Sequence, residues 1–254
     1  MKRLVLILLL LTAPLAYAQE EYYGPLHKGS WIFNGFLEAG TKEGFSLAPT
    51  ARCTYALLDN FVAEGAISVE NQYPAAMDNG ILIPKGSLSF RATIPLKEGA
   101  EDRYGMIPLE QRLFVRHFGA YDLREWNFQT LTGWCNKHFT LNVGFQHRIV
   151  SDLNAMVFDP SEPYVVEPFN LVYLARYTHT WNNSSLNFRI TNTDLFFTDY
   201  FLNPSLGLGY ALRLKENMSV WGDLYYHPTS IFNLTATNYE LMLRLGLTIS
   251  TLKQ

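Results

Sequence analysis

The stretch NYELMLRLGLTI, residues 238–249, alternates strictly between large apolar side chains and polar or small ones. One face would carry Tyr239, Leu241, Leu243, Leu245, Leu247 and Ile249, and the other Asn238, Glu240, Met242, Arg244, Gly246 and Thr248. Successive side chains of a β-strand point to opposite faces, so this period of two predicts a strand. The first face is too apolar for water, and the second carries too much charge for a membrane helix.

The same alternation recurs along the chain, for example in HFTLNVGFQHRI (138–149) and SSLNFRITNT (184–193). These segments are about 10 to 14 residues long, close to the roughly 9 to 11 residues that cross a bilayer at a tilt and longer than the usual 5 or 6 of a soluble sheet. We predict about twelve strands, with ten or fourteen as alternatives, near 30–40, 45–56, 61–71, 86–96, 108–118, 122–132, 137–150, 167–180, 185–194, 202–213, 218–227 and 237–251.

The connections between these segments alternate in length, as in barrels of the outer membrane. Short ones lie at 57–60, 133–137, 181–185 and 214–217. Lipid offers the backbone no hydrogen-bond partners, so a sheet in a membrane must close on itself, and chain ends on one side require an even number of strands. Aromatic residues near strand ends are expected to form interfacial girdles: Tyr55, Phe61, Trp134, Phe139, Trp181, Trp221 and Tyr239.

The N-terminus has the pattern of a secretory signal peptide. Lys2 and Arg3 precede a short apolar run, and a small-residue site ends before Gln19. We therefore predict a signal peptide over 1–18 and a single domain over 19–254. The net charge of −3 argues against nucleic-acid binding. Cys53 and Cys135 are too few for a disulfide framework, no residues have metal-ligand spacing, and no cofactor is expected.

Taken together, the alternating strands, the connection pattern and the signal sequence resemble those of Gram-negative outer-membrane β-barrel proteins. The resemblance covers nearly the whole mature chain, but it is to an architecture and to no particular functional family. It implies an all-β, antiparallel, up-and-down transmembrane barrel in the outer membrane. Lipid and lipopolysaccharide would surround this barrel, and the barrel-assembly machinery would insert it.

Strand parity assigns many charged side chains to the inner face. The arginines are Arg52, Arg91, Arg112, Arg116, Arg148, Arg176, Arg189, Arg213 and Arg244, and the acids are Glu38, Glu64, Glu70, Glu110, Glu125, Asp223 and Glu240. Of these we predict as pore-lining Arg52, Arg91, Arg112, Arg148, Arg176, Arg189, Asp223, Glu240 and Arg244. Asp223 and Arg244 are expected to pair, because they fall near mid-height of adjacent strands.

Two interpretations of this charged interior stay open. Ion pairs that fill the lumen would make a non-conducting structural or surface-binding barrel. Arginines that line a narrow opening would make a porin-like channel for small hydrophilic or anionic solutes, which is the leading hypothesis.

A lipid-modifying outer-membrane enzyme is a more distant alternative. The candidate histidines are His117, His147, His179 and His227, and His147 beside Ser151 or Asp152 comes nearest to a catalytic pair. No nucleophile motif accompanies them, so no catalytic residue is assigned and we expect that the protein is not an enzyme.

Overall fold

The computed structural model describes residues 26–41, 44–74, 80–98, 101–118, 123–151, 169–195, 204–228 and 239–251. The described chain forms twelve strands and one short helix. The strands are β1 (Trp31–Gly40), β2 (Gly44–Leu58), β3 (Phe61–Pro74), β4 (Ile81–Pro95), β5 (Met106–Phe118), β6 (Leu123–Cys135), β7 (Phe139–Ser151), β8 (Phe169–Trp181), β9 (Ser184–Thr191), β10 (Ser205–Lys215), β11 (Met218–Pro228) and β12 (Tyr239–Thr251). The helix is α2 (Glu101–Tyr104), between β4 and β5. The predicted signal peptide lies outside the described residues.

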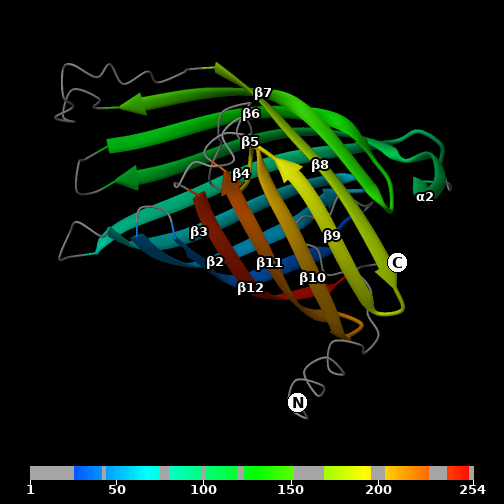
Figure 1. Cartoon of the computed structure of the whole chain (residues 1–254). Coiled ribbons are helices and arrows are strands. Elements are labelled where there is room, and N and C mark those ends of the chain that lie inside the picture. The colour runs from blue at the N-terminus through cyan, green and yellow to red at the C-terminus, as the bar shows by residue number, and fades with distance from the viewer. Residues whose placement is uncertain are drawn as a thin grey trace, which may run out of the picture.

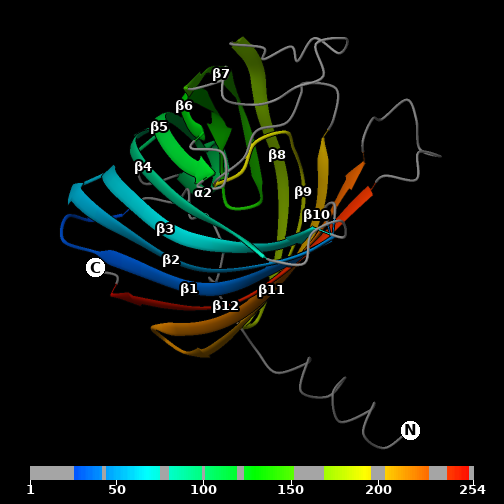
Figure 2. The ribbon, with the colours of Figure 1, turned by 90° about the vertical axis from the view of Figure 1, so that its left-hand side faces the viewer.

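Each strand pairs antiparallel with its neighbours in sequence, and β1 pairs with β12 to close the barrel (Figures 1 and 2). At the seam, Trp31 lies opposite Thr251 and Gly40 lies opposite Met242. No edge of the sheet is left open, which is the condition for a sheet in lipid. The predicted twelve-stranded barrel is confirmed.

Burial alternates along the strands as the sequence pattern predicts. On β12 the leucines Leu241, Leu243, Leu245 and Leu247 are exposed on the outer face. Met242, Arg244 and Thr248 lie between them and are buried inside the barrel. The opening stretch is therefore the closing strand, with its apolar face outward and its polar face inward.

At the end of the barrel that holds Trp31 of β1 and Thr251 of β12, tight turns join neighbouring strands. Asn60, between β2 and β3, and Asn182, between β8 and β9, have positive φ values of 61° and 50°. Asparagine tolerates this left-handed conformation better than most residues, which suits it to such turns. In the described part of the chain, no helix is long and apolar enough to span a membrane.

Several of the predicted girdle residues lie on the outer wall near these turns, namely Tyr55, Phe61, Trp134, Phe139 and Trp181. Trp221 was assigned wrongly. It is 5% exposed and lies inside the barrel against Phe36, with ring centroids 5.3 Å apart. The side chain of Tyr239 is outside the described residues.

Several strand boundaries differ from the predicted ones by three to five residues, and two of these differences affect the inner face. β4 begins at Ile81 instead of near 86, which adds Lys85 to the inner face. β9 ends at Thr191 instead of 194 and has only eight residues. This early end of β9 positions the candidate site.

Candidate functional site

The chain leaves the barrel wall directly after β9. The backbone N–H of Tyr173 on β8 donates to Oδ1 of Asn192 (2.8 Å), and Nδ2 of Asn192 donates to the carbonyl of Leu171 (2.7 Å). The Asn192 side chain thus occupies backbone groups of β8 that a longer β9 would have paired. Such local side-chain bonds compete with a strand ladder, so β9 ends here.

Residues 192–195, which we call the strap, run into the barrel interior. Thr193 exchanges hydrogen bonds with Gln129 on β6 (2.8 and 3.1 Å). Asp194 pairs with Arg244 on β12. Leu195 is buried in an apolar cluster with Phe36, Ala66, Ala211 and Trp221. The strap is therefore fixed to walls that lie on different sides of the lumen.

Arg244 is the main anchor of the strap. Its Nε donates to Oε2 of Glu38 on β1 (2.7 Å), and its Nη2 donates to Asp194. Its guanidinium also lies 4.9 Å from the centroid of the Tyr225 ring, and Nη1 donates to the Tyr225 hydroxyl (3.2 Å). Two carboxylates and an aromatic face compensate this buried charge, as a buried arginine requires.

Arg189 holds the other side of the same tyrosine. It donates to Asp223 (3.1 Å) and Asn187 (3.0 Å), and it also bonds the Tyr225 hydroxyl. Glycine on β10 makes room for this network, because a Cβ at Gly209 would fall 1.9 Å from Oδ1 of Asp223. The Arg189–Tyr225–Arg244 cluster is thus a packed, ion-paired wall that extends from β9 to β12.

The expected pairing of Asp223 with Arg244 is matched in register, where the two residues lie directly opposite each other. The ion pairs of these two residues, however, also involve other strands. Asp223 binds Arg189, and Arg244 binds Glu38 and Asp194.

A second charged cluster lies on the opposite part of the wall. Glu125 on β6 accepts from Nε of Arg116 (2.5 Å), and Asn127 donates to it (2.7 Å). Glu125 also forms an ion pair with Arg148, whose Nε lies 2.8 Å from Oε1. The Arg116 and Arg148 side chains are 23% and 25% exposed, whereas that of Arg244 is 2% exposed. Water therefore reaches the arginines of β5 and β7 but not the arginine that anchors the strap.

The other predicted pore-lining residues also lie on the inner face. Arg112 pairs with Glu110 (3.0 Å), and the buried Arg176 donates to Thr140 (3.1 Å). Arg91 is buried opposite Glu110, Glu240 is half-buried opposite His227, and Arg52 is buried near Glu64. Their role in lining a pore stays a prediction.

Sequence reasoning missed several members of the site. The predicted strand 185–194 included Asn192, Thr193 and Asp194, and Leu195 lay just beyond it, so the strap was not recognised as a separate segment. Tyr225 shares the parity of Asp223, so the same rule places it on the inner face, but it was not included among the candidate residues. Lys85, which pairs with Glu70 in the structure, preceded the predicted start of its strand.

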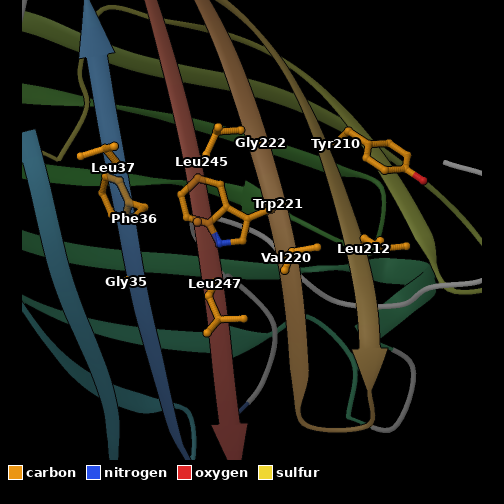
Figure 3. A pocket seen from close by; sticks show the side chains of 11 residues that line it. Gly35, Phe36, Leu37, Tyr210, Leu212, Val220, Trp221, Gly222, Leu245 and Leu247 are labelled. Atoms are coloured by element: carbon orange, nitrogen blue, oxygen red, sulfur yellow. The ribbon is translucent and has the colours of Figure 1, made fainter. Parts of the chain in front are cut away.

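A groove of about 780 Å³ crosses β1, β12, β11 and β10 and opens on the outer wall (Figure 3). It is lined by Gly35, Phe36, Leu37, Tyr210, Leu212, Val220, Trp221, Gly222, Leu245, Gly246 and Leu247. The outward positions Gly35 and Gly222 carry no side chain, which leaves space between the surrounding apolar groups. The lining contains no carboxylate, amine, thiol or imidazole, so the groove suits hydrocarbon and offers no chemistry.

Two of the candidate histidines, His147 and His227, have described contacts. His147 packs against Phe169, with ring centroids 4.6 Å apart, and its Nδ1 makes no hydrogen bond within the described chain. Asp152 and the side chain of Ser151 are outside the described residues. The Ser205 hydroxyl lies 2.9 Å from both ring nitrogens of His227, so it is not directed at one nitrogen as a nucleophile and its base require.

No family model matches the chain, and no curated protein has a similar sequence. Solved structures do share the fold. An outer membrane channel from Pseudomonas putida F1 is 12% identical, with 93% of this chain and 100% of that chain covered and a TM-score of 0.55. An active-site mutant of outer membrane phospholipase A from Escherichia coli (7% identity, 91% and 94% covered, TM-score 0.49) and the KdgM porin (5%, 86% and 99%, TM-score 0.47) are also similar. At these identities the likeness establishes the fold alone, and the chain therefore has the fold of an outer-membrane β-barrel.

Proposed function

We propose that this barrel resides in the outer membrane and is a narrow, porin-like channel for small hydrophilic or anionic solutes. The strap would form the constriction, and the wall of β5 to β7 would line the open side. The observation that carries the proposal is the partial exposure of Arg116 and Arg148 on the inner face. Charged side chains that stay hydrated inside a barrel suit a water-filled passage better than a solid plug.

The local charge favours anions over cations. Arg116 and Arg148 share the single carboxylate of Glu125, so this cluster carries excess positive charge. Charged residues around a narrow opening select ions of the opposite sign. By contrast, the cluster of Arg189 and Arg244 includes Glu38, Asp194 and Asp223, and it is expected to hold the strap and not to attract solutes.

Planar-bilayer recording of the refolded protein tests the proposal. In a KCl gradient we expect small conductance steps and a reversal potential on the anion-selective side. The double variant Arg116→Gln/Arg148→Gln should move the reversal potential towards zero. Arg124→Gln is the matched control, because Arg124 lies on the outer face of the same strand as Glu125 and is exposed. A folded barrel without conductance, or unchanged selectivity in the double variant, would contradict the proposal.

A non-conducting barrel is the second candidate, and one observation favours it. The side chains of Arg52, Arg244 and Tyr225 are almost completely shielded from water, which is typical of a filled interior. This candidate expects no conductance in the natural protein. A non-conducting barrel should also show no conductance when the strap is loosened, whereas a channel should then conduct more.

Location and activity have their own tests. Membrane fractionation should recover the protein with the outer membrane, where lipopolysaccharide and other lipids would surround it. Its insertion should depend on the barrel-assembly machinery, so depletion of that machinery should reduce the folded form. We expect no lipid hydrolysis, and a phospholipase signal that His147→Ala abolishes would instead support the enzyme alternative.

A further inference from the structure

Arg52 differs from the other inward arginines described above. Its side chain is 1% exposed, and its Nε, Nη1 and Nη2 atoms make no hydrogen bond to any residue that the structure describes. The nearest carboxylate oxygen, Oε1 of Glu64, is 4.0 Å from Nη1, which is too long for a hydrogen bond. The guanidinium of Arg189, by comparison, lies 3.1 Å from a carboxylate.

The polar groups around Arg52 already have partners of their own. Thr50 donates to Ser68 (2.8 Å), and Thr54 donates to Oε2 of Glu64 (2.7 Å). Asn34, directly opposite Arg52 on β1, accepts from Thr248. The hydroxyl and amide groups nearest to Arg52 are therefore engaged with one another, and only Oε1 of Glu64 faces its guanidinium, at 4.0 Å.

An arginine cannot lose its proton to escape this situation. A buried charge without hydrogen bonds is strongly unfavourable, so buried charges are normally paired. The five N–H groups of a guanidinium form a planar fork that matches the two oxygens of a carboxylate or a phosphate. Arg52 has a long ion pair with Glu64 but no hydrogen-bond acceptor among the described residues, and the acceptor that its N–H groups lack is thus expected to be an oxyanion.

We propose that Arg52 is a binding site inside the barrel for the carboxylate or phosphate group of a small solute, a role that rests on the proposed channel function. Ala66 lies directly opposite Arg52 on β3, and its side chain packs in the same apolar cluster as Leu195 of the strap. The site therefore adjoins the constriction. Because Arg52 is only 1% exposed, a solute can reach it only when the side chains around it move.

Thermal unfolding in detergent micelles tests the site without requiring conduction. Intrinsic tryptophan fluorescence would follow unfolding in sodium acetate or sodium phosphate, each against sodium chloride at the same ionic strength. A ligand that binds only the folded state raises the unfolding temperature in a saturable way. We expect this rise with at least one probe, and the two salts distinguish a carboxylate site from a phosphate site.

Three variants test whether the salt-specific rise in unfolding temperature depends on Arg52. Arg52→Gln should abolish the salt-specific rise. Arg112→Gln is the matched control, because Arg112 is an inward arginine that already pairs with Glu110, and it should leave the rise intact. Glu64→Gln should tighten anion binding at least a few-fold, because it removes a like charge next to the bound anion.

The same unfolding temperature in all salts, or an unchanged rise in Arg52→Gln, would overturn the site. If Arg52→Gln does not fold, Arg52→Lys keeps the charge without the fork and should bind several-fold more weakly, and equal affinity would also count against the site. Failure of the proposed channel function can be distinguished from failure of the Arg52 site. If the barrel does not conduct but shows salt-specific stabilisation that depends on Arg52, the channel is refuted and the site stands. If the barrel conducts without such stabilisation, the site is refuted and the channel stands.

Discussion

The substitution Asp194→Asn tests whether the strap is a closed element held by one ion pair. Asparagine has nearly the same shape as aspartate but carries no charge. Asp194 and Arg244 are 6% and 2% exposed, so their interaction is shielded from water. The substitution removes the pair and leaves the strap backbone unchanged.

The expected magnitude follows from the contacts of the strap. Breaking a buried ion pair by removing one partner costs about 3–5 kcal/mol. Arg244 keeps Glu38 at 2.7 Å, so its charge stays partly compensated and we take the lower value of about 3 kcal/mol. Since about 1.4 kcal/mol corresponds to a factor of ten, the equilibrium between closed and open strap shifts by roughly 100-fold. The bonds of Asn192 and Thr193 remain, so the strap should still be mostly closed.

Hydrogen exchange followed by mass spectrometry measures this shift directly. The N–H of Thr193 donates to Oγ1 of Thr191 (3.0 Å), and it exchanges only when the strap opens. In Asp194→Asn the peptide that covers the strap should exchange about 100-fold faster, while peptides from β2 to β4 stay unchanged. If the variant conducts, its open periods should lengthen in parallel.

Glu70→Gln is the matched control for this experiment. It removes an inward carboxylate that pairs with Lys85, but it has no described contact with the strap. Exchange in the strap should therefore match that of the natural protein. Unchanged exchange in Asp194→Asn, or equal acceleration in both variants, would refute the assignment of Asp194 as the anchor.

Two further predictions concern packing and selectivity. In Gly246→Ala the new methyl carbon would lie about 2.5 Å from the indole packed over it, so we expect a loss of about 1–3 kcal/mol in unfolding free energy, measured by urea unfolding in micelles. Gly35→Ala is its control, because its nearest contact would be 3.6 Å away, and similar losses in both variants would contradict the packing argument. Glu125→Gln removes the carboxylate shared by Arg116 and Arg148, so the reversal potential should become more anion-selective, and a shift towards cations would contradict the charge assignment.

The strands and their faces were predictable because each strand obeys one local rule. A side chain that faces lipid must be apolar, and the next residue along the strand then faces the interior. Once one apolar position is known, the facing of every other residue in that strand follows. Arg244 was placed inside on this basis alone, and its burial confirms the assignment. The closed sheet follows from the same solvent argument, because open edges are not tolerated in lipid.

Contacts between distant elements were not predictable in this way. Residues 192–194 fell within a predicted strand, and only the hydrogen bonds of Asn192 to β8 show that the chain has left the wall. Trp221 sits near a strand end, where aromatic residues are usually interfacial. It lies inside because Gly246 on the neighbouring strand leaves room for the indole, whose Nε1 donates to Thr248 (3.1 Å). Both outcomes depend on pairs of residues far apart in the sequence.

The inner arginines form two groups with different surroundings, which bears on whether they fill the barrel or line a passage. Arg189 and Arg244 are enclosed by carboxylates and by Tyr225, so they lock the strap in place. Arg116 and Arg148 both pair with Glu125 and are 23% and 25% exposed, so in the proposed channel their charge would face a solute. In the proposed channel, identical residue types at identical parity would thus serve two purposes, on either side of the strap. Loosening the strap should therefore change conductance without changing the sign of selectivity, whereas changing the β5 and β7 arginines should do the opposite.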